Sequence, residues 1–328
     1  MLDEFLGGAE AKRAGRPELR RKFVSARRDI LLTMLRGVTG QGCPASAKSG
    51  GAAVPHGANE WGPDANRRSY VHIYAMSDIH GCLDAFKTSL STVDLDAEDS
   101  KLVLLGDYCD RGPDSLGVFE LIMDLQKRYG DRVVALRGNH EEMFLEYIDE
   151  VNDPNFTQAW ILADSNLATA KSFLDAEAFK HVKHLLRLRE FEEAYAFTVE
   201  RIKAEHADII AWVRKLPYVY ESPFSQVFVH AGVDEEAGEY WKLGTSAESF
   251  TMMMPDYVGH EFYLDVIAGH INTEAVSGIA GYRGIWHDGA SHYYIDGNVM
   301  EHGEVAVLSY DSETGKYGGQ GLEWVGGL

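Results

Sequence analysis

The sequence predicts an α/β fold. Short apolar runs of β type recur along it, and each ends in a polar loop that contains glycine. Continuous apolar runs of this length are typical of buried strands. Segments with helical spacing at 83–90, 115–129 and 141–149 separate strands in the first half of this series. The alternation of strand and helix indicates an α/β architecture.

Six apolar runs are predicted as strands. They cover residues 71–76, 101–105, 133–136, 226–229, 264–268 and 292–295. Asp, His and Asn residues stand just after these runs, next to glycines that let the backbone turn tightly. Since ligands in open α/β sheets bind outside the carboxyl ends of strands, we expect the functional site in these loops.

The chain divides into an extension and a folded domain. Residues 17–36 could form a basic helix, and residues 39–69 are rich in Gly, Ala, Ser and Pro, as in flexible linkers. We expect residues 1–69 to be a disordered extension, with a partner- or membrane-binding helix as the alternative. Residues 70–328 form the domain, and residues 155–217, with helical patterns and almost no Gly or Pro, form a helical cap inserted into it.

Charge is distributed unevenly. The net charge is −20; residues 1–69 carry 12 Lys/Arg and 7 Asp/Glu, whereas the other 259 residues carry 19 and 44. A nucleic-acid binder needs a basic face, so we expect no nucleic-acid partner. An acidic body also repels anionic substrates at long range. Phosphate chemistry here would need strong local positive charge, which metal ions can supply.

No targeting or membrane segment is predicted. The chain has no apolar stretch near the roughly 18 to 20 residues that span a bilayer. The cysteines are Cys43, Cys82 and Cys109, an odd number without a C-x-x-C pair, which suits a reducing compartment. We therefore expect a cytoplasmic protein with no membrane partner.

The polar residues at the strand ends form a candidate metal set. Its members are Asp78, His80, Asp107, Asn139, His230 and His270. Mixed oxygen and nitrogen ligands suit Mn²⁺, Fe or Zn²⁺ better than Ca²⁺. Six ligands exceed one tetrahedral site but suit two adjacent metals that share a carboxylate. Such a pair, roughly 3.5–4 Å apart, can clamp a phosphoryl oxygen and generate hydroxide near neutral pH.

Each candidate ligand also has a simpler explanation. Asp78 and Asn139 stand where they could cap the next helix in the chain, and His230 could be a half-buried core histidine. The metal interpretation is favoured because all six stand at strand ends beside glycine.

Five motifs follow one another in order within about residues 71–310: Asp78-Ile79-His80-Gly81, Gly106-Asp107-Tyr108-Cys109-Asp110-Arg111-Gly112, Gly138-Asn139-His140-Glu141, His230-Ala231-Gly232 and Gly269-His270. In these motifs and their order the sequence resembles the phosphoprotein-phosphatase branch of the calcineurin-like metallophosphoesterases. The resemblance implies a four-layer sandwich of two mixed β-sheets flanked by helices, with residues 70–328 as a metallophosphatase domain.

The resemblance also implies roles. Asp78, His80 and Asp107 would hold one divalent metal, and Asp107, Asn139, His230 and His270 the other, with Mn²⁺ favoured. His140 would be the general acid, oriented by Asp110, while Arg111 and Arg137 would grip the phosphate. Histidine titrates near neutral pH, and the planar guanidinium fork of arginine matches phosphate oxygens. Water would attack phosphorus directly, without a phosphoenzyme.

The sequence departs from the family pattern in its second half. Family phosphatases usually have a phosphate-binding Arg between the two late histidines, but residues 231–269 contain no Arg and only Lys242 as a basic Lys/Arg residue. Arg283 could substitute, although it lies after His270. Three functions are therefore considered: a serine/threonine-type protein phosphatase, a symmetrical diadenosine-tetraphosphate hydrolase, and a silent metal-binding scaffold. The intact ligand set argues against the third, and the acidic body favours the first.

Overall fold

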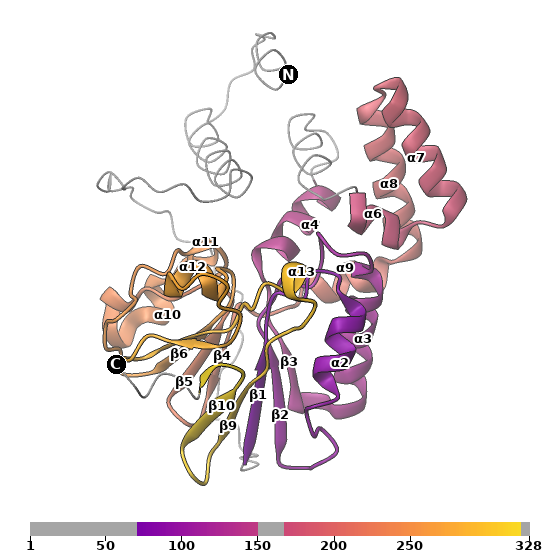
Figure 1. Cartoon of the computed structure of the whole chain (residues 1–328). Coiled ribbons are helices and arrows are strands. Elements are labelled where there is room, and N and C mark those ends of the chain that lie inside the picture. The colour runs from indigo at the N-terminus through magenta and orange to yellow at the C-terminus, as the bar shows by residue number, and fades with distance from the viewer. Residues whose placement is uncertain (1–70, 150–166, 323–328) are drawn as a thin grey trace, which may run out of the picture. The chain divides into compact units, whose positions relative to one another are not determined.

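The computed structural model describes residues 71–149 and 167–322 of the 328-residue chain. All of the described residues lie in the second of the chain's two units, residues 65–328. The predicted extension at 1–69 and the first part of the predicted cap, up to residue 166, lie outside the described residues. The labelled helices and strands in Figure 1 all belong to the second unit.

The first sheet is built mainly from the amino-terminal part of the unit. Its strands stand in the order β10-β9-β1-β2-β3. Their bounds are β1 His72–Met76, β2 Ser100–Leu104, β3 Val133–Ala135, β9 Leu308–Asp311 and β10 Lys316–Gly319. β1, β2 and β3 pair in parallel, and β9 pairs antiparallel with both β1 and β10. The carboxyl ends of β1, β2 and β3 therefore meet at one edge of the sheet.

The second sheet is also mixed, with three parallel strands at its centre. Its order is β4-β5-β6-β8-β7, with bounds β4 Val219–Ser222, β5 Gln226–Val229, β6 Asp265–Ala268, β7 Trp286–His287 and β8 His292–Tyr294. β5, β6 and β8 are parallel, whereas β4 and β7 pair antiparallel at the two edges. A second set of parallel strand ends is thus available to the site.

Helices cover the outer faces of the sheets. Those of the first half are α2 Leu83–Leu90, α3 Ser115–Tyr129 and α4 Asn139–Asp149, with a 3₁₀ turn η1 at Gly130–Arg132. Those of the second half are η3 Glu235–Tyr240, α10 Trp241–Gly244, α11 Ala247–Met252, α12 Thr273–Ser277 and α13 Val299–His302. The three helices expected from spacing in the first half are present, and α4 begins two residues earlier than predicted.

Two apolar layers fix the sheets. Alternate residues of β1 and β2 point to opposite faces. Ile73 and Val103 face the second sheet, where they pack in one cluster with Phe228 and Ile267. Met76 and Leu104 face the helices and lie in one cluster with Phe119 of α3. The two mixed sheets flanked by helices confirm the predicted α/β sandwich.

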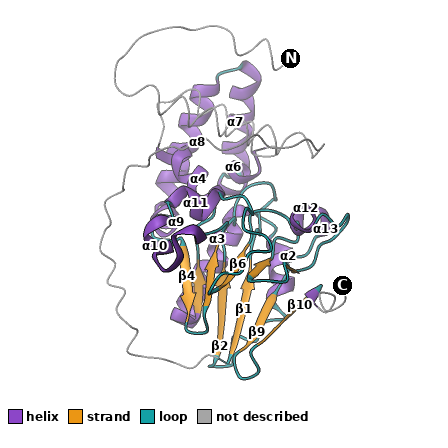
Figure 2. Cartoon of the chain, turned by 90° about the vertical axis from the view of Figure 1, so that its left-hand side faces the viewer, coloured by secondary structure: helices purple, strands orange, loops and turns teal. Residues whose placement is uncertain are grey.

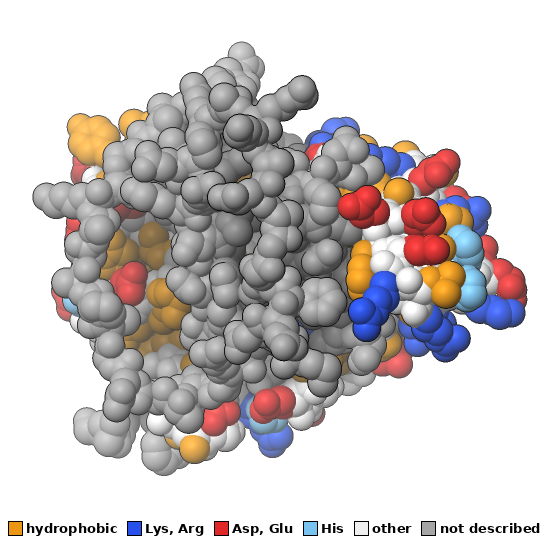
Figure 3. Space-filling model, turned by 90° about the horizontal axis from the view of Figure 1, so that it is seen from above, with side chains coloured by type: hydrophobic (Ala, Val, Ile, Leu, Met, Phe, Trp, Pro, Cys, Tyr) orange, Lys and Arg blue, Asp and Glu red, His pale blue; other side chains and the backbone are white. Residues whose placement is uncertain are grey.

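The insertion between β3 and β4 is helical where it is described. It comprises α6 Ala168–Phe173, α7 Ala176–Leu188, α8 Phe191–Glu205 and α9 Ala207–Val213, which we call the cap helices. α7 and α8 pack along an apolar seam that includes Val182 and Leu185. In Figure 2 the cap helices lie beyond the same end of the sheets as α4. Acidic and basic side chains mix on the outer end of the cap (Figure 3), where exposed Lys180 lies 3.8 Å from Glu177.

Within the part of the chain that the structure describes, no helix is both long and apolar enough to cross a membrane.

A buried charge cluster fixes the segment that comes after the predicted ligand His230. His292 of β8 contacts Asp288 through Nδ1 (2.6 Å) and Glu235 of η3 through Nε2 (2.7 Å). These two carboxylates raise the pKa of His292 to about 9 against the cost of burial, and the hydrogen bonds of Asp288 lower its pKa to about 2. The charged imidazole therefore ties η3 to the second sheet.

This cluster predicts a pH-dependent contribution to stability. The pKa of His292 is higher in the folded protein than its ordinary 6.5, so the contribution is complete below pH 6.5 and is lost as pH rises through about 9. We compare wild type and His292→Gln by urea unfolding from pH 5 to 10. The stability difference should be largest below pH 6.5 and decline across that window. A difference that does not change with pH would contradict this, and exposed His184→Gln serves as the control.

Candidate metal centre

The six predicted metal ligands meet where the two sheets end. Asp78 and His80 come after β1, Asp107 after β2, and Asn139 opens α4 after β3. His230 and His270 come directly after β5 and β6 of the other sheet. A hydrogen bond from the His270 backbone N–H to Oδ2 of Asp78 (3.0 Å) joins the two halves. All six side chains lie at the edge that the α/β pattern predicts.

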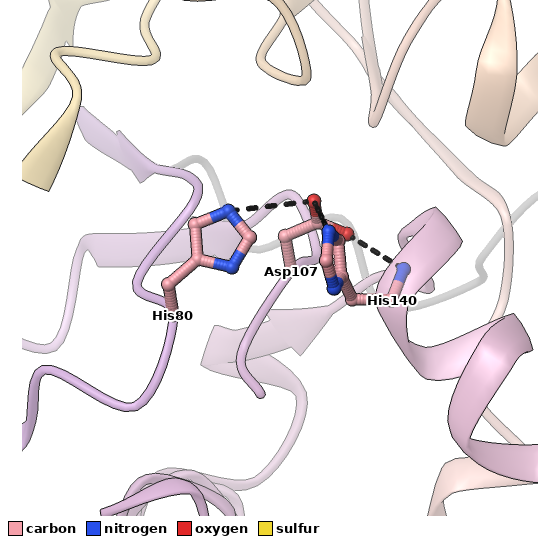
Figure 4. Close-up of side chains that lie close together, drawn as sticks. All are labelled: His80, Asp107 and His140. Atoms are coloured by element: carbon pink, nitrogen blue, oxygen red, sulfur yellow. Dashed lines mark hydrogen bonds and ion pairs between the residues drawn. The ribbon is translucent and has the colours of Figure 1, made fainter. Parts of the chain in front are cut away.

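Two ligand groups share one carboxylate. Potential ligand atoms of His80, Asp107 and His140 lie within 4.8 Å of one another, as do those of Asp107, His230 and His270. Figure 4 shows the His80 and His140 rings directed at the Asp107 carboxylate, with Nε2 atoms 3.7 and 3.8 Å from Oδ2. The position of Asp107 suits a carboxylate that bridges two ions.

Asp78 completes the first group. Its Oδ1 lies 3.8 Å from Nε2 of His80. Both atoms are buried without a hydrogen-bond partner. Buried polar atoms without partners are costly, and a cation between them would satisfy both.

Hydrogen bonds fix how the histidines present their lone pairs. Nδ1 of His80 lies 3.0 Å from the Cys109 carbonyl, and Nδ1 of His230 lies 3.1 Å from the Leu105 carbonyl. A carbonyl only accepts, so each Nδ1 is the protonated nitrogen and each Nε2 carries a lone pair. Metal-binding histidines are usually oriented by a second hydrogen bond of this kind.

The Asn139 amide can take two orientations. With Oδ1 toward the site, that oxygen lies 2.8 Å from Nε2 of His230 and 3.0 Å from Nδ1 of His270. Rotated by 180°, the amide nitrogen would donate to these nitrogens and to Asp107. The first orientation is the one that suits a bound cation, because the amide oxygen is a metal ligand and the NH₂ group is not.

Burial shifts the ionisation of the whole group. It raises the pKa of Asp78 to about 6, and burial together with the nearby Asp78 raises the pKa of Asp107 well above its usual range. Burial also lowers the pKa of His230 to about 3 and depresses that of His80 and His270. Neutral imidazoles and carboxylates that lack a counter-charge form a donor set that divalent ions fit.

Backbone geometry holds several of these side chains in place. Asp78, His80, Asp107 and His270 all have positive φ, between 46° and 67°. Such conformations are unfavourable for non-glycine residues and persist only when the surroundings enforce them. At Gly138 a side chain would collide with the Asp107 carboxylate and its backbone nitrogen. The close approach of the two loops therefore requires glycine there.

The predicted acid and its orienting group are in contact. Nδ1 of His140 donates to Oδ2 of Asp110 over 2.7 Å, and Nη2 of Arg111 lies 3.2 Å from Nε2. Burial and Arg111 lower the pKa of His140 well below 6.5, and burial raises the pKa of Asp110 to about 6. His140 thus presents Nε2 beside Asp107 while its other nitrogen is held by a carboxylate.

Arg137 does not face the site. Its Nη1 donates to Glu142 (3.0 Å) and to the Tyr218 hydroxyl (3.2 Å). Its Nη2 donates to the carbonyls of Val213 and Arg214, at the end of α9. Protein groups thus accept from both terminal nitrogens of the guanidinium, and the phosphate-binding role of Arg137 stays a prediction.

The other two basic residues considered in connection with the missing arginine lie in other surroundings. Nζ of Lys242 pairs with Glu221 over 2.6 Å on an exposed surface. Arg283 lines a separate concavity with Tyr282 and Glu304. Among the basic residues considered from sequence, Arg111 alone contacts a described residue of the site.

Glu141 and Thr169 were missed as functional residues. The fully buried Glu141 carboxylate accepts from the backbone N–H groups of Asp107, Tyr108 and Gly138 at 2.7–2.9 Å, and so ties two ligand loops together. Its place directly after Asn139-His140 was a signal for this role. Thr169 of α6 donates to Asp110 over 2.6 Å, and no local motif marks it.

Known proteins resemble this chain in sequence and structure. A family model described as "Calcineurin-like phosphoesterase" matches residues 71–271, more than half of the chain. "Serine/threonine-protein phosphatase 1" of Salmonella typhimurium is 37% identical over 24% of this chain and 34% of that protein. "Bis(5'-nucleosyl)-tetraphosphatase, symmetrical" of Nitrosococcus oceani is 26% identical over 53% and 47%. The matches thus span about a third to a half of these relatives.

Among solved structures, a protein serine/threonine phosphatase from Saccharomyces cerevisiae aligns with a TM-score of 0.44 and 14% identity. The alignment covers 75% of each chain.

The contacts of the two arginines predict different effects of their removal. Arg137→Ala would leave the Val213 and Arg214 carbonyls without this donor and would remove one of the donors to Glu142, so we expect a loss of about 1–3 kcal/mol in unfolding free energy. Arg111→Ala should change stability by less and lower kcat/KM for phosphate esters. Chemical unfolding and steady-state kinetics of both variants test this. A stable Arg137→Ala variant with a raised KM for phosphate esters would instead support its predicted phosphate role.

Proposed function

Because the chain belongs to the calcineurin-like phosphoesterase family, we propose that it hydrolyses phosphate monoesters with the help of two divalent metal ions. The observation that carries the proposal is that His80, His230 and His270 gather around Asp107, with Asp78 beside His80, Asn139 beside the other two histidines, and His140 held by Asp110. Mn²⁺ suits the mixed ligands, and Fe or Zn²⁺ would also fit. When bound, the ions would polarise the phosphoryl group and lower the pKa of a water molecule.

The chain's own residues would orient the ester and deliver a proton. Arg111 would contact the phosphoryl oxygens, a role supported by the 3.2 Å distance between its Nη2 and Nε2 of His140. As the P–O bond breaks, the leaving oxygen takes its electron pair and receives the proton from His140. Burial and Arg111 disfavour the imidazolium form of His140, and the Asp110 carboxylate on the other ring nitrogen opposes them.

The substrate class we favour is a phosphoserine or phosphothreonine side chain of a protein. One arginine beside the metals suits a single phosphoryl group, while Arg137 and Lys242 pair with protein groups. Outside residues 1–69 the chain carries 44 Asp/Glu against 19 Lys/Arg, which repels a polyphosphate more than a monoester.

The second candidate is symmetrical hydrolysis of a dinucleoside tetraphosphate. It is favoured by the Nitrosococcus oceani relative, whose match extends over 53% of this chain. Both candidates use the same metals and acid. They differ in what binds beyond the reacting phosphoryl group.

One experiment separates the candidates and tests the acid. With Mn²⁺ present, kcat/KM is measured on phosphoserine peptides, diadenosine tetraphosphate and 4-nitrophenyl phosphate. We expect the phosphopeptide to be preferred over the dinucleotide. His140→Asn should slow hydrolysis of the phosphopeptide by roughly 10²–10⁴-fold. Hydrolysis of 4-nitrophenyl phosphate should slow much less, because nitrophenolate leaves without a proton.

Metal content of each variant is measured alongside. Exposed His184→Asn on α7 is the matched control and should behave as wild type. Loss of metal from His140→Asn would make the residue a ligand instead of the acid. Preference for the dinucleotide would select the second candidate.

A further inference from the structure

Asp110 is held from both sides. Its Oδ2 accepts from Nδ1 of His140 (2.7 Å), and its Oδ1 accepts from the Thr169 hydroxyl (2.6 Å). Thr169 belongs to α6 of the cap, 59 positions further along the chain, and is fully buried. The pair of His140 and Asp110 is therefore hydrogen-bonded to the cap through the Thr169 hydroxyl.

The hydroxyl also contacts the Asp110 backbone. The Asp110 N–H lies 3.0 Å from Oγ1 of Thr169 and 3.1 Å from Oγ of Ser115, and the two hydroxyls are 3.0 Å apart. A hydroxyl has one proton, so Thr169 donates to the carboxylate and accepts from the N–H and from Ser115. Asp110 has φ 67°, a conformation that needs such support.

α6 is fixed firmly enough to position that hydroxyl. Oγ of Ser172 accepts from the Leu116 N–H at the start of α3 (3.2 Å) and donates to the Thr169 carbonyl (2.8 Å). The Phe173 ring stacks on Phe144 of α4, with centroids 5.6 Å apart. Since α3 and α4 flank the site, these contacts hold α6 in a fixed position relative to His140.

We propose that Thr169 is a positioning residue for the general acid, a role that rests on the proposed function. Its hydroxyl keeps the Asp110 carboxylate turned toward Nδ1 of His140 and stabilises its charged form by a charge-assisted hydrogen bond. Thr169 itself transfers no proton. The proton passes from Nε2 of His140 to the leaving oxygen, which takes the electron pair of the broken P–O bond, while water supplies the new oxygen on phosphorus.

The inference makes the hydroxyl, and not the volume of the side chain, responsible for the effect. Thr169→Val keeps the shape and removes the hydroxyl, whereas Thr169→Ser keeps the hydroxyl and removes a methyl group. With the Mn²⁺-loaded enzyme, Thr169→Val should lower kcat on an alkyl phosphate about tenfold, a fraction of the effect of removing the acid itself. Thr169→Val should change kcat on 4-nitrophenyl phosphate, and KM for both substrates, less than about twofold. Thr169→Ser should recover most of the lost kcat.

Matched variants separate positioning from packing. Thr198→Val, a buried threonine of α8 whose hydroxyl bonds to its own helix, should leave the ratio of the two rates unchanged. In an Asp110→Asn background, Thr169→Val should add little. If Thr169→Val does not fold, Ser115→Ala provides the second test, with a smaller change in the same direction.

Three results would overturn the inference. The first is that Thr169→Val slows both substrates equally. The second is that Thr169→Ser lowers kcat more than Thr169→Val does. The third is that the effects of Thr169→Val and Asp110→Asn on kcat are fully additive. If His140→Asn is selective for the poor leaving group while Thr169→Val and Ser115→Ala are not, this inference alone fails. If His140→Asn shows no such selectivity, the acid assignment of the proposed function fails first.

Discussion

The burial of two carboxylates and several imidazole lone pairs at one point is the constraint on which this structure depends. Asp107 and Asp78 are 1–2% exposed, and burial raises the pKa of both carboxyls. A protein gains nothing in stability from such a group by itself. Bound divalent ions would offset this cost by coordinating the buried oxygens and nitrogens. The two sheets and the glycine-containing loops bring these ligands together.

Because of that constraint, further hydrogen bonds are needed to hold the ligand loops and the general acid in place. Glu141 draws the loops after β2 and β3 together through three backbone N–H groups. The acid His140 is held by Asp110, and Asp110 by Thr169 of the cap. Arg137 ties the end of α9 to α4. Groups that do not touch substrate thus define where the reacting groups stand.

Sequence predicted the parts of the fold and site that depend on local pattern. Strand ends with Asp, His or Asn beside glycine place Asp78 and His230 correctly, because parallel strands bring their carboxyl ends to one edge. The antiparallel strands β4, β7, β9 and β10 were not predicted, since they are short or lack a continuous apolar run. Thr169 and the true contacts of Arg137 depend on how the cap helices pack, which no local spacing records.

The central claim is that Asp107 serves two metal ions at once, and metal stoichiometry tests it most directly. Equilibrium dialysis with Mn²⁺ on wild type, Asp107→Asn and the exposed control Asp208→Asn measures the ions bound per chain. The account predicts two ions in wild type and in the control, and weakened binding of both ions in Asp107→Asn. An Asp107→Asn variant that retains one ion at wild-type affinity, or a wild type that binds one ion, would contradict it.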